Sequence, residues 1–389
     1  MPWQEVSAME QRQEFVRLAM QEGVNRRELC RRFGISPDVG YKWLRRFADG
    51  DRALADRSRR PEHSPRLSGA DVETPVLAMR DAHPAWGPRK IAHCLARAGL
   101  APPALSTIHA ILRRHGRIAP SERAAAFQRF EKDAPNLLWQ MDFKGRVAMS
   151  NGGSCHPLTV IDDHSRYALC LQACGNEQTT TVQSRLSLAF RRYGLPDAVF
   201  VDNGTPWGDA AGARWTRFGV WLLKLGVDIR HSRPYHPQSR GKNERFHRSL
   251  KAEVLALRQL RNLDDAQQAF DAWRMIYNFE RPHEGIGLAV PASRYRPSNR
   301  AMPDRLPRIE YDQHEIVRKI PATKAYVRFK GRWWKVPQAF CGEHVAIRPR
   351  DSDGRYEICF AAHPIATIDL TNPKSVSDVS ERVSAMSPG

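Results

Sequence analysis

The sequence predicts a multidomain chain with an all-α N-terminal arm, an α/β core and a small C-terminal β-barrel. Two groups of apolar residues at helical spacing precede residue 120, and strand-like runs begin near residue 136. Beyond residue 320, four short runs of β-forming residues are separated by turn sequences. The predicted segments are a first helix-turn-helix module (1–50), a basic linker (51–67), a second helix-turn-helix module (68–120), the core (135–292), a second linker (293–320), the barrel (321–371) and a disordered tail (372–389).

The first module is predicted to hold three helices between residues 10 and 47. Ser36 and Pro37 supply an N-cap and a first-turn proline for the third helix, after a turn at Gly34. A basic helix after such a turn fits a helix-turn-helix whose second helix enters a major groove. A plain three-helix bundle with a solvated basic face fits equally well. The third helix is expected to bury Trp43, Leu44 and Phe47 and to present Lys42, Arg45 and Arg46 to DNA.

The second module repeats this layout and favours the DNA-binding interpretation. Its helices are expected at 72–82, 87–98 and 106–115, with Ile91 and Leu95 packed against apolar residues of the third helix. Those apolar residues are Ile108, Ile111 and Leu112, and the expected DNA contacts on the same helix are Ser106, Thr107, His109 and Arg113.

The linker between the two modules is rich in arginine and proline, so it cannot bury a core. Arg57, Arg59 and Arg60 are candidates for threading a minor groove. A solvated charged linker is an equal alternative.

The core begins with strands and continues with alternating helices and strands. Strands are predicted at 137–147, 156–161, 167–171, 198–201 and 227–231, with helices at 178–192 and 214–225 and two long helices starting at residues 242 and 264. Three antiparallel strands followed by such an alternation are what a ribonuclease-H-like fold requires. Asp162 and Asp163, between two of the strands, are interpreted as turn residues and not as metal ligands.

The C-terminal part is predicted to be a small antiparallel barrel or sheet. Its four strands are expected at 325–329, 333–336, 344–348 and 356–360. Trp333 and Trp334 are most simply core and surface aromatic residues of this part, although the neighbouring Lys330, Arg332 and Lys335 also allow a DNA-binding surface.

Three acidic residues of the core lie at positions where their side chains can converge. Asp142 and Asp202 close short apolar runs that are typical of strands, and Glu244 opens a basic amphipathic stretch that is typical of a helix. Three carboxylates at one point suit Mg²⁺ or Mn²⁺. Two such ions, about 3.5–4 Å apart, stabilise the attacking and leaving oxygens of an in-line phosphoryl displacement. Each acid alone is better explained as a turn residue or a solvated cap.

The flanking motifs strengthen the interpretation. The three acids with their neighbours, together with residues 233–238 and 277–283, resemble the catalytic core of bacterial insertion-sequence transposases of the retroviral-integrase-like DDE superfamily. The resemblance covers residues 135–291. The gap between Asp202 and Glu244 is longer than is usual for the family, and residues 206–213 are the expected loop insertion. Glu253 lacks the motif context, so Glu244 is preferred.

The resemblance implies the roles of the site. Asp142, Asp202 and Glu244 would be catalytic residues and ligands of two Mg²⁺ or Mn²⁺ ions in a DNA-cleaving and DNA-joining enzyme. Arg248 and Lys251, one and two helical turns after Glu244, would grip the terminal DNA, with a solvated helix face as the alternative. His283 matches a family motif, and a structural hydrogen-bonding role is at least as plausible for it.

Composition bounds the partners. The chain has 389 residues with 61 Lys and Arg against 42 Asp and Glu, a net charge of +19, which favours a polyanionic partner. No long apolar run or signal-peptide pattern favours a membrane, and the seven scattered cysteines favour reduced, buried thiols over a zinc site. We expect a bacterial cytoplasmic, nucleoid-associated protein that is at least a dimer on DNA, because two element ends must be joined together. A catalytically inactive DNA-binding repressor and a simple metal-dependent nuclease are the alternatives.

Overall fold

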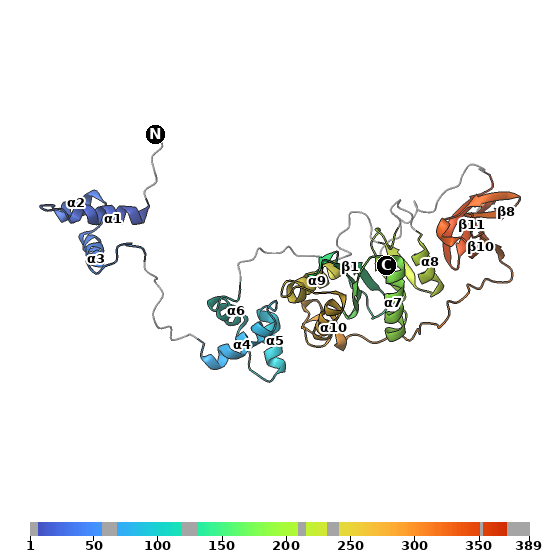
Figure 1. Cartoon of the computed structure of the whole chain (residues 1–389), viewed down its shortest axis with the longest axis horizontal. Helices are drawn as coiled ribbons and strands as arrows, with labels where there is room; N and C mark the ends of the chain where they lie inside the picture. The colour runs from blue at the N-terminus through green and yellow to red at the C-terminus, as the bar shows by residue number, and fades with distance from the viewer. Residues whose placement is uncertain are drawn as a thin grey trace. The chain divides into compact units, whose positions relative to one another are not determined.

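The computed structural model describes residues 7–56, 68–118, 131–208, 215–231, 241–350 and 353–371. The chain divides into two compact units, Met1–Leu67 and Ser68–Gly389 (Figure 1). Some of the residues singled out from the sequence lie outside the described ranges: Arg57, Arg59 and Arg60, the motif at 233–238, most of the expected loop insertion and the tail from residue 372.

The first unit has three helices, as predicted. They are α1 (Ala8–Ala19), α2 (Arg26–Arg32) and α3 (Pro37–Ala48). The predicted start of α3 is confirmed, because the Ser36 side chain accepts a hydrogen bond from a backbone N–H of the first turn and Pro37 follows it. Phe15, Leu29 and Trp43, one from each helix, meet in the core of the unit.

The second unit opens with another three-helix group. Its helices are α4 (Ala70–Ala82), α5 (Pro88–Arg97) and α6 (Leu105–Arg114). Ile91 and Leu95 of α5 pack against Ile108, Ile111 and Leu112 of α6, which is the predicted contact. Because these residues of α6 are buried against α5, the opposite side of α6 faces solvent.

The core contains a mixed sheet. Its elements are β1 (Trp139–Phe143), β2 (Val147–Ala148), β3 (Ser154–Asp162), β4 (Ala168–Cys174), α7 (Thr179–Tyr193), β5 (Ala198–Val201), α8 (Arg217–Lys224), β6 (Asp228–His231), α9 (Gly241–Leu250) and α10 (Leu263–Phe279). Strands β4, β3, β1, β5 and β6 lie side by side in this order, and β2 also pairs with β3. β1, β3 and β4 are antiparallel neighbours, whereas β5 and β6 run parallel to β1. This topology confirms the predicted ribonuclease-H-like fold, except that residues 144–146 break the first expected strand into β1 and β2.

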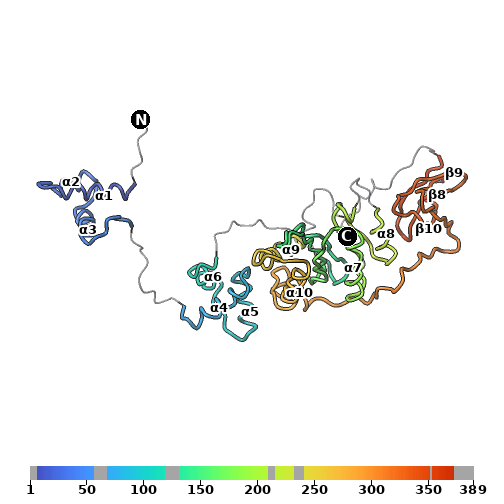
Figure 2. Tube along the Cα trace, in the orientation of Figure 1, coloured from blue at the N-terminus to red at the C-terminus, as the bar shows by residue number. Residues whose placement is uncertain are grey.

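Two helical layers cover the two faces of this sheet. Trp139 and Met141 of β1 pack into a cluster with α7 and α8. Ile161 of β3 and Leu171 of β4 pack into a second cluster with α9 and α10. Figure 2 shows α9 and α10 together on one side of the core and α7 on the other. A side chain of the sheet therefore points either toward the α7 layer or toward the α9 layer.

The C-terminal region forms two small sheets. Its strands are β7 (Ile316–Lys319), β8 (Tyr326–Phe329), β9 (Arg332–Lys335), β10 (His344–Pro349), β11 (Arg355–Phe360) and β12 (His363–Asp369). One sheet has the order β12-β11-β10-β7, and β8 pairs with β9 alone. The four predicted strands are present, whereas β7 and β12 were not predicted. The closed barrel is not confirmed, because the described strands form separate sheets.

The segment predicted as the second linker is largely ordered. Tyr295 stacks on Tyr167 of the core with ring centroids 4.4 Å apart. Arg300 donates hydrogen bonds to the backbone oxygens of Pro196 and Gly226, at 2.8 and 2.5 Å. β7 also lies within residues 293–320, so the two ends of this segment are structured.

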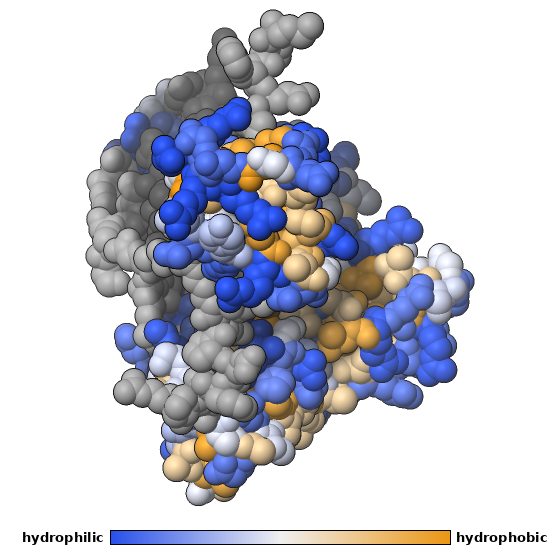
Figure 3. All heavy atoms as spheres, turned by 90° about the vertical axis from the view of Figure 1, so that its left-hand side faces the viewer, coloured by the Kyte–Doolittle hydropathy of each residue, from blue (hydrophilic) through white to orange (hydrophobic). Residues whose placement is uncertain are grey.

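The seven cysteines are all free, which agrees with the predicted reduced thiols. Among the described helices, none is long and apolar enough to cross a bilayer. Among the coloured residues in the view of Figure 3, hydrophilic side chains predominate, with smaller apolar areas between them.

Candidate metal centre and DNA-binding surfaces

The parallel pairing of β1 and β5 brings Asp142 and Asp202 to the same level. Trp139 is the register partner of Val199 and Gln140 that of Phe200, a constant offset of 60 residues. The same offset, 202 − 142 = 60, aligns Asp142 with Asp202 one step beyond the end of β5. Neighbouring strands lie about 4.8 Å apart, so the two carboxylates stand on adjacent strands, at the carboxyl ends of β1 and β5.

The alternation of β1 turns Asp142 toward the α9 layer, and the alternation of β5, continued by one residue, turns Asp202 the same way. Trp139 and Met141 on β1, and Val199 and Val201 on β5, are buried against α7 and α8. Successive side chains of a strand point to opposite faces, so the residue that follows Met141 or Val201 turns to the other face. Asp142 and Asp202 are both half-buried. The Asp202 carboxylate also accepts a hydrogen bond from the N–H of Gly204 at 3.1 Å, which fixes its direction in the turn.

A short hydrogen-bond chain joins α9 to β1 beside Asp142. The hydroxyl of Thr159 on β3 donates to the backbone oxygen of Asp142 at 2.8 Å. Nε2 of His247 on α9 lies 2.8 Å from the same hydroxyl and, since the hydroxyl proton is used, donates to it. Glu244 precedes His247 by three residues, so it lies on the same face of α9, one turn toward the N-terminus. The exposed Glu244 is thereby placed on the helix face that lies beside β1.

His247 adds no charge to this region at neutral pH. Burial, and next the nearby cation of Lys144, lower the pKa of its imidazole to about 4. A protonated imidazole would repel a divalent cation, whereas the neutral ring only bridges helix and strand. The motif around Glu244 contained His247, but its role depends on a partner 88 residues away and could not be read from the local sequence.

The donor set fits a hard cation. Asp142, Asp202 and Glu244 offer only carboxylate oxygens, which are the ligands that Mg²⁺ and Mn²⁺ prefer. Within the described residues, no three His, Cys, Asp or Glu side chains are already gathered as a metal site. The backbone thus places the three acids around one edge of the sheet, while their side chains are not drawn together.

Two basic residues continue the Glu244 face of the helix. Arg248 and Lys251 are exposed, four and seven residues after Glu244. The α-helical register holds as far as Lys251, where a π-helical turn, η2 (Lys251–Leu255), begins. Both side chains therefore rise from the same stripe as the acid, as the helical spacing predicts.

Glu253 is engaged elsewhere. Its carboxylate accepts hydrogen bonds from Arg281 at 2.9 Å and from the indole of Trp273 at 2.8 Å. The side chains of Glu253 and Arg281 are both less than a tenth exposed. This buried ion pair joins η2 to the end of α10, which gives Glu253 a structural role.

His283 is also buried, packed edge to face against Tyr277 with centroids 4.5 Å apart. Burial, and next the cation of Arg281, hold the pKa of its imidazole well below the ordinary value. Its backbone N–H donates to Ala289 at 3.0 Å, so the segment after α10 folds back around this ring. These contacts favour the structural alternative for His283.

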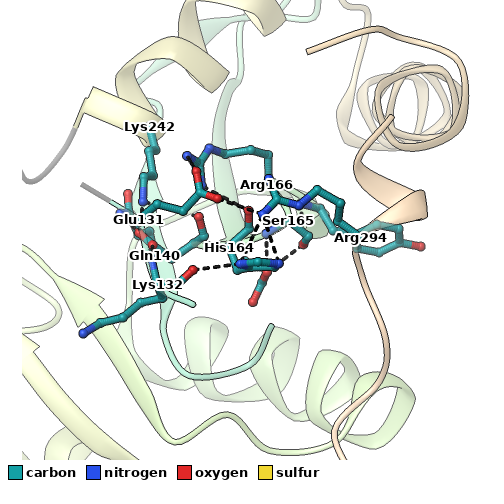
Figure 4. A network of polar contacts seen from close by, with 11 residues as sticks. Glu131, Lys132, Gln140, His164, Ser165, Arg166, Lys242 and Arg294 are labelled. Atoms are coloured by element: carbon teal, nitrogen blue, oxygen red, sulfur yellow. Dashed lines mark hydrogen bonds and ion pairs between the residues drawn. The ribbon is translucent and has the colours of Figure 1, made fainter. Parts of the chain in front are cut away.

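Asp162 and Asp163 lie at the β3–β4 turn, as predicted, but both are fully buried. Asp162 accepts hydrogen bonds from Ser165 and from the N–H of Asn136. Asp163 forms an ion pair with Lys242 of α9 at 2.5 Å. Figure 4 shows the surrounding polar network. The sequence indicated the turn but not these long-range partners.

One of the three predicted DNA-facing residues of α3 is instead structural. Lys42 and Arg45 are exposed. Arg46 is only 8% exposed, and its guanidinium donates to Asp51 and to the backbone oxygen of Ala55. It also lies over the ring of Trp43, 4.7 Å from the centroid. The prediction that Arg46 faces DNA is therefore wrong, because its guanidinium is bound by the carboxylate of Asp51, which lies beyond the end of α3.

The solvent face of α6 carries the other predicted contacts. Ser106, His109 and Arg113 are exposed and Thr107 is half-buried. The buried residues of this helix, Ile108, Ile111 and Leu112, lie on the opposite side. This arrangement is compatible with a recognition helix.

Family models match most of these parts. Integrase core domain models match residues 132–237 and 225–291, and therefore include β1, β5, α9 and all three acids. The model of the C-terminal domain of the IS481 family transposases matches residues 315–375, beginning at β7. A helix-turn-helix model matches residues 11–62, and a homeodomain-like model matches residues 39–112. These matches support an insertion-sequence transposase of the DDE integrase superfamily.

Relatives among curated proteins agree with this family. The chain is 29% identical over 171 residues to an uncharacterized 31.7 kDa protein of insertion element IS407 from Burkholderia multivorans, covering 44% of this chain and 59% of that protein. It is 29% identical over 174 residues to a 39.2 kDa protein of IS476 from Xanthomonas euvesicatoria, covering 43% and 48%. The chain thus spans about half the length of these insertion-element proteins. Among solved structures, a chain of the simian T-cell lymphotropic virus intasome is 16% identical with a TM-score of 0.37, over 77% of this chain and all of that one.

Arg45 and Arg46 should respond differently to alanine substitution. Arg45→Ala is expected to weaken binding to element-end DNA, and to relax discrimination at one base pair by about 1–3 kcal/mol if the side chain reads a base edge. Arg46→Ala is expected to reduce the stability of the first unit by about 1–3 kcal/mol, because it removes the hydrogen bonds from the guanidinium to Asp51 and to the backbone oxygen of Ala55. Thermal unfolding and fluorescence anisotropy measure the two effects. Equal losses of DNA binding at unchanged stability would contradict the assignment.

The stability of the second unit should fall as the pH falls below about 6.5. His247 and His283 have folded-state pKa values below the unfolded value of about 6.5, so the unfolded chain binds protons that the folded chain does not. Each histidine then removes up to about 1.4 kcal/mol per pH unit, and for His247 this continues to about pH 4. Urea unfolding at pH 7.5 and 5.0 tests this. His283→Asn should make the free energy of unfolding depend less on pH, whereas substitution of an exposed histidine, His109→Gln, is the control and should leave the pH dependence as it is.

Proposed function

We propose that the chain is a transposase that binds the terminal inverted repeats of its mobile element, cleaves the DNA ends and joins their 3′-hydroxyls to target DNA. The observation that carries the proposal is the shared level of Asp142 on β1 and Asp202 one residue beyond β5, together with the burial of their strand neighbours on the face opposite the helix that bears Glu244. Phosphoryl transfer between DNA strands needs no protein nucleophile, because the attacking group is water or a 3′-hydroxyl. The site offers carboxylates that would bind the activating metal ions.

The three carboxylates would hold two Mg²⁺ or Mn²⁺ ions, with Asp142 and Asp202 shared and Glu244 completing one site. When bound, the ions activate the attacking water or 3′-hydroxyl and neutralise the leaving oxygen. The protein's part is to hold the acids at fixed positions. The hydrogen bonds from His247 to Thr159 and from Thr159 to the backbone of Asp142 would hold α9 at a fixed position beside β1. The exposed Arg248 and Lys251 would contact the phosphates of the terminal DNA strand.

The N-terminal arm would supply recognition. The exposed faces of α3 and α6 carry Lys42, Arg45, Ser106, His109 and Arg113, and each helix is the last of its three-helix group. Two modules allow two neighbouring DNA segments of an element end to be read by one chain. Arg57, Arg59 and Arg60 in the linker between them would add phosphate or minor-groove contacts. We place the activity in the bacterial cytoplasm, at the nucleoid.

Substitution of the acids should separate DNA binding from chemistry. Asp142→Asn, Asp202→Asn and Glu244→Gln keep side-chain volume but remove the charge that holds a hard cation, so cleavage and joining should be abolished. Binding to end DNA should survive with its steep salt dependence. Purified variants with Mg²⁺ and labelled end DNA provide the measurement.

Glu253→Gln is the matched control, because Glu253 lies in a neighbouring turn but pairs with Arg281. It should remain active. Cleavage by Asp142→Asn at the unmodified rate would end the metal-site proposal and favour a repressor that only binds DNA. Cleavage without joining in the unmodified protein would favour a simple nuclease.

The active complex is expected to contain at least two chains. Two element ends must be joined in concert, and one site acts on one strand at a time. Light scattering of the complex with end DNA should give at least one chain per end. An active complex with a single chain on two ends would rule this out.

A further inference from the structure

A buried carboxylate lies between the two elements that bear predicted metal ligands. Asp163, in the turn after β3, has no exposed surface. It receives the ammonium of Lys242 at 2.5 Å, the amide of Gln140 at 2.7 Å and the backbone N–H of Lys132 at 2.8 Å. Figure 4 shows Lys242, Gln140 and Lys132 near one another on different segments of the chain.

Two of the three partners of Asp163 stand two residues from predicted ligands. Gln140 precedes Asp142 by two residues on β1, so both side chains point to the same face of the sheet. Lys242 precedes Glu244 by two residues in the first turn of α9. One carboxylate therefore binds both the strand of the first acid and the helix of the third, and it fixes the distance between them.

The turn that carries Asp163 is itself held by a second layer of contacts. Glu131 accepts hydrogen bonds from Arg166 and Arg294, both at 2.9 Å. His164 donates through Nδ1 to the backbone oxygen of Lys132 at 2.7 Å, and Arg294 lies 3.2 Å from its Nε2. Arg166 has a φ of 66°, a conformation that costs a side-chain-bearing residue free energy. These contacts make the turn a rigid support.

A buried ion pair is a costly means of joining a helix to a sheet. Replacing such a pair by packed apolar residues is often neutral or stabilising, so stability alone does not explain it. The site has a particular need for a fixed helix. Three carboxylates brought together repel one another until a cation neutralises them, and this repulsion tends to push α9 from β1. A charged anchor two residues from Glu244 opposes that motion.

We propose that Asp163 is a positioning residue that sets the separation of Asp142 and Glu244 through Gln140 and Lys242. The effect of Asp163 on catalysis rests on the proposed function. The anchoring itself is a property of the protein without metal or DNA.

The primary variant is Asp163→Asn, which keeps the shape of the side chain and removes its charge. The Mg²⁺ concentration needed for half-maximal cleavage should rise about 10–100-fold, as for other residues that orient metal ligands, while the rate at saturating Mg²⁺ changes less. Hydrogen–deuterium exchange of amides 241–247, measured in the full chain without metal, should quicken. Binding to end DNA should stay unchanged.

Glu253→Gln is the matched control, since it also removes the acid of a buried ion pair at the other end of the same helical stretch. If both variants lose stability equally, only Asp163→Asn should raise the Mg²⁺ requirement. Equal Mg²⁺ requirements of the two variants, or unchanged exchange at 241–247 in Asp163→Asn, would overturn the proposal.

If Asp163→Asn does not fold, Asp163→Asn with Lys242→Gln removes both buried charges and serves in its place. It should fold and still show the raised Mg²⁺ requirement and the faster exchange, and normal values of both would overturn the proposal. The exchange measurement does not depend on activity. Failure of the unmodified protein to cleave DNA would count against the proposed function alone.

Discussion

The parallel pairing of β1 with β5 is the constraint on which the candidate site depends. Its offset of 60 residues puts Asp142 and Asp202 on adjacent strands at one level, and burial of the alternate residues against α7 and α8 turns both acids to the opposite face. A slip of one residue would turn Asp142 into the apolar layer of α7 and α8 and turn Met141 toward the α9 layer. The apolar alternation that builds the core therefore also determines where the acids lie.

Electrostatic repulsion among the acids shapes the surroundings of the site. The helix that brings Glu244 is tied to the sheet on both sides of that residue, by Lys242 to Asp163 and by His247 to Thr159. One tie is a buried ion pair, and the other is a neutral hydrogen bond that leaves the net charge of the acids unchanged. Both hold α9 in place without occupying the carboxylates of Asp142, Asp202 and Glu244 themselves.

Local patterns predicted the helices and most strands, because caps and apolar spacing are encoded within a few residues. Ser36 and Pro37 at the start of α3 are an example. β7 was missed because it is short and mostly exposed, with Arg318 and Lys319 at its end. The burial of Arg46 depends on Asp51 beyond the helix, and the partners of Asp163 come from residues 23 to 79 positions away. Such contacts depend on the tertiary fold, so they cannot be predicted from a local sequence pattern.

The most direct test of the account is to locate Mn²⁺ in crystals of the protein with end DNA by its anomalous scattering. The account predicts a peak between the carboxylates of Asp142 and Asp202, with Glu244 within coordinating distance of it or of a second peak. A peak at another cluster, or none near these residues in crystals whose DNA is cleaved, would contradict it.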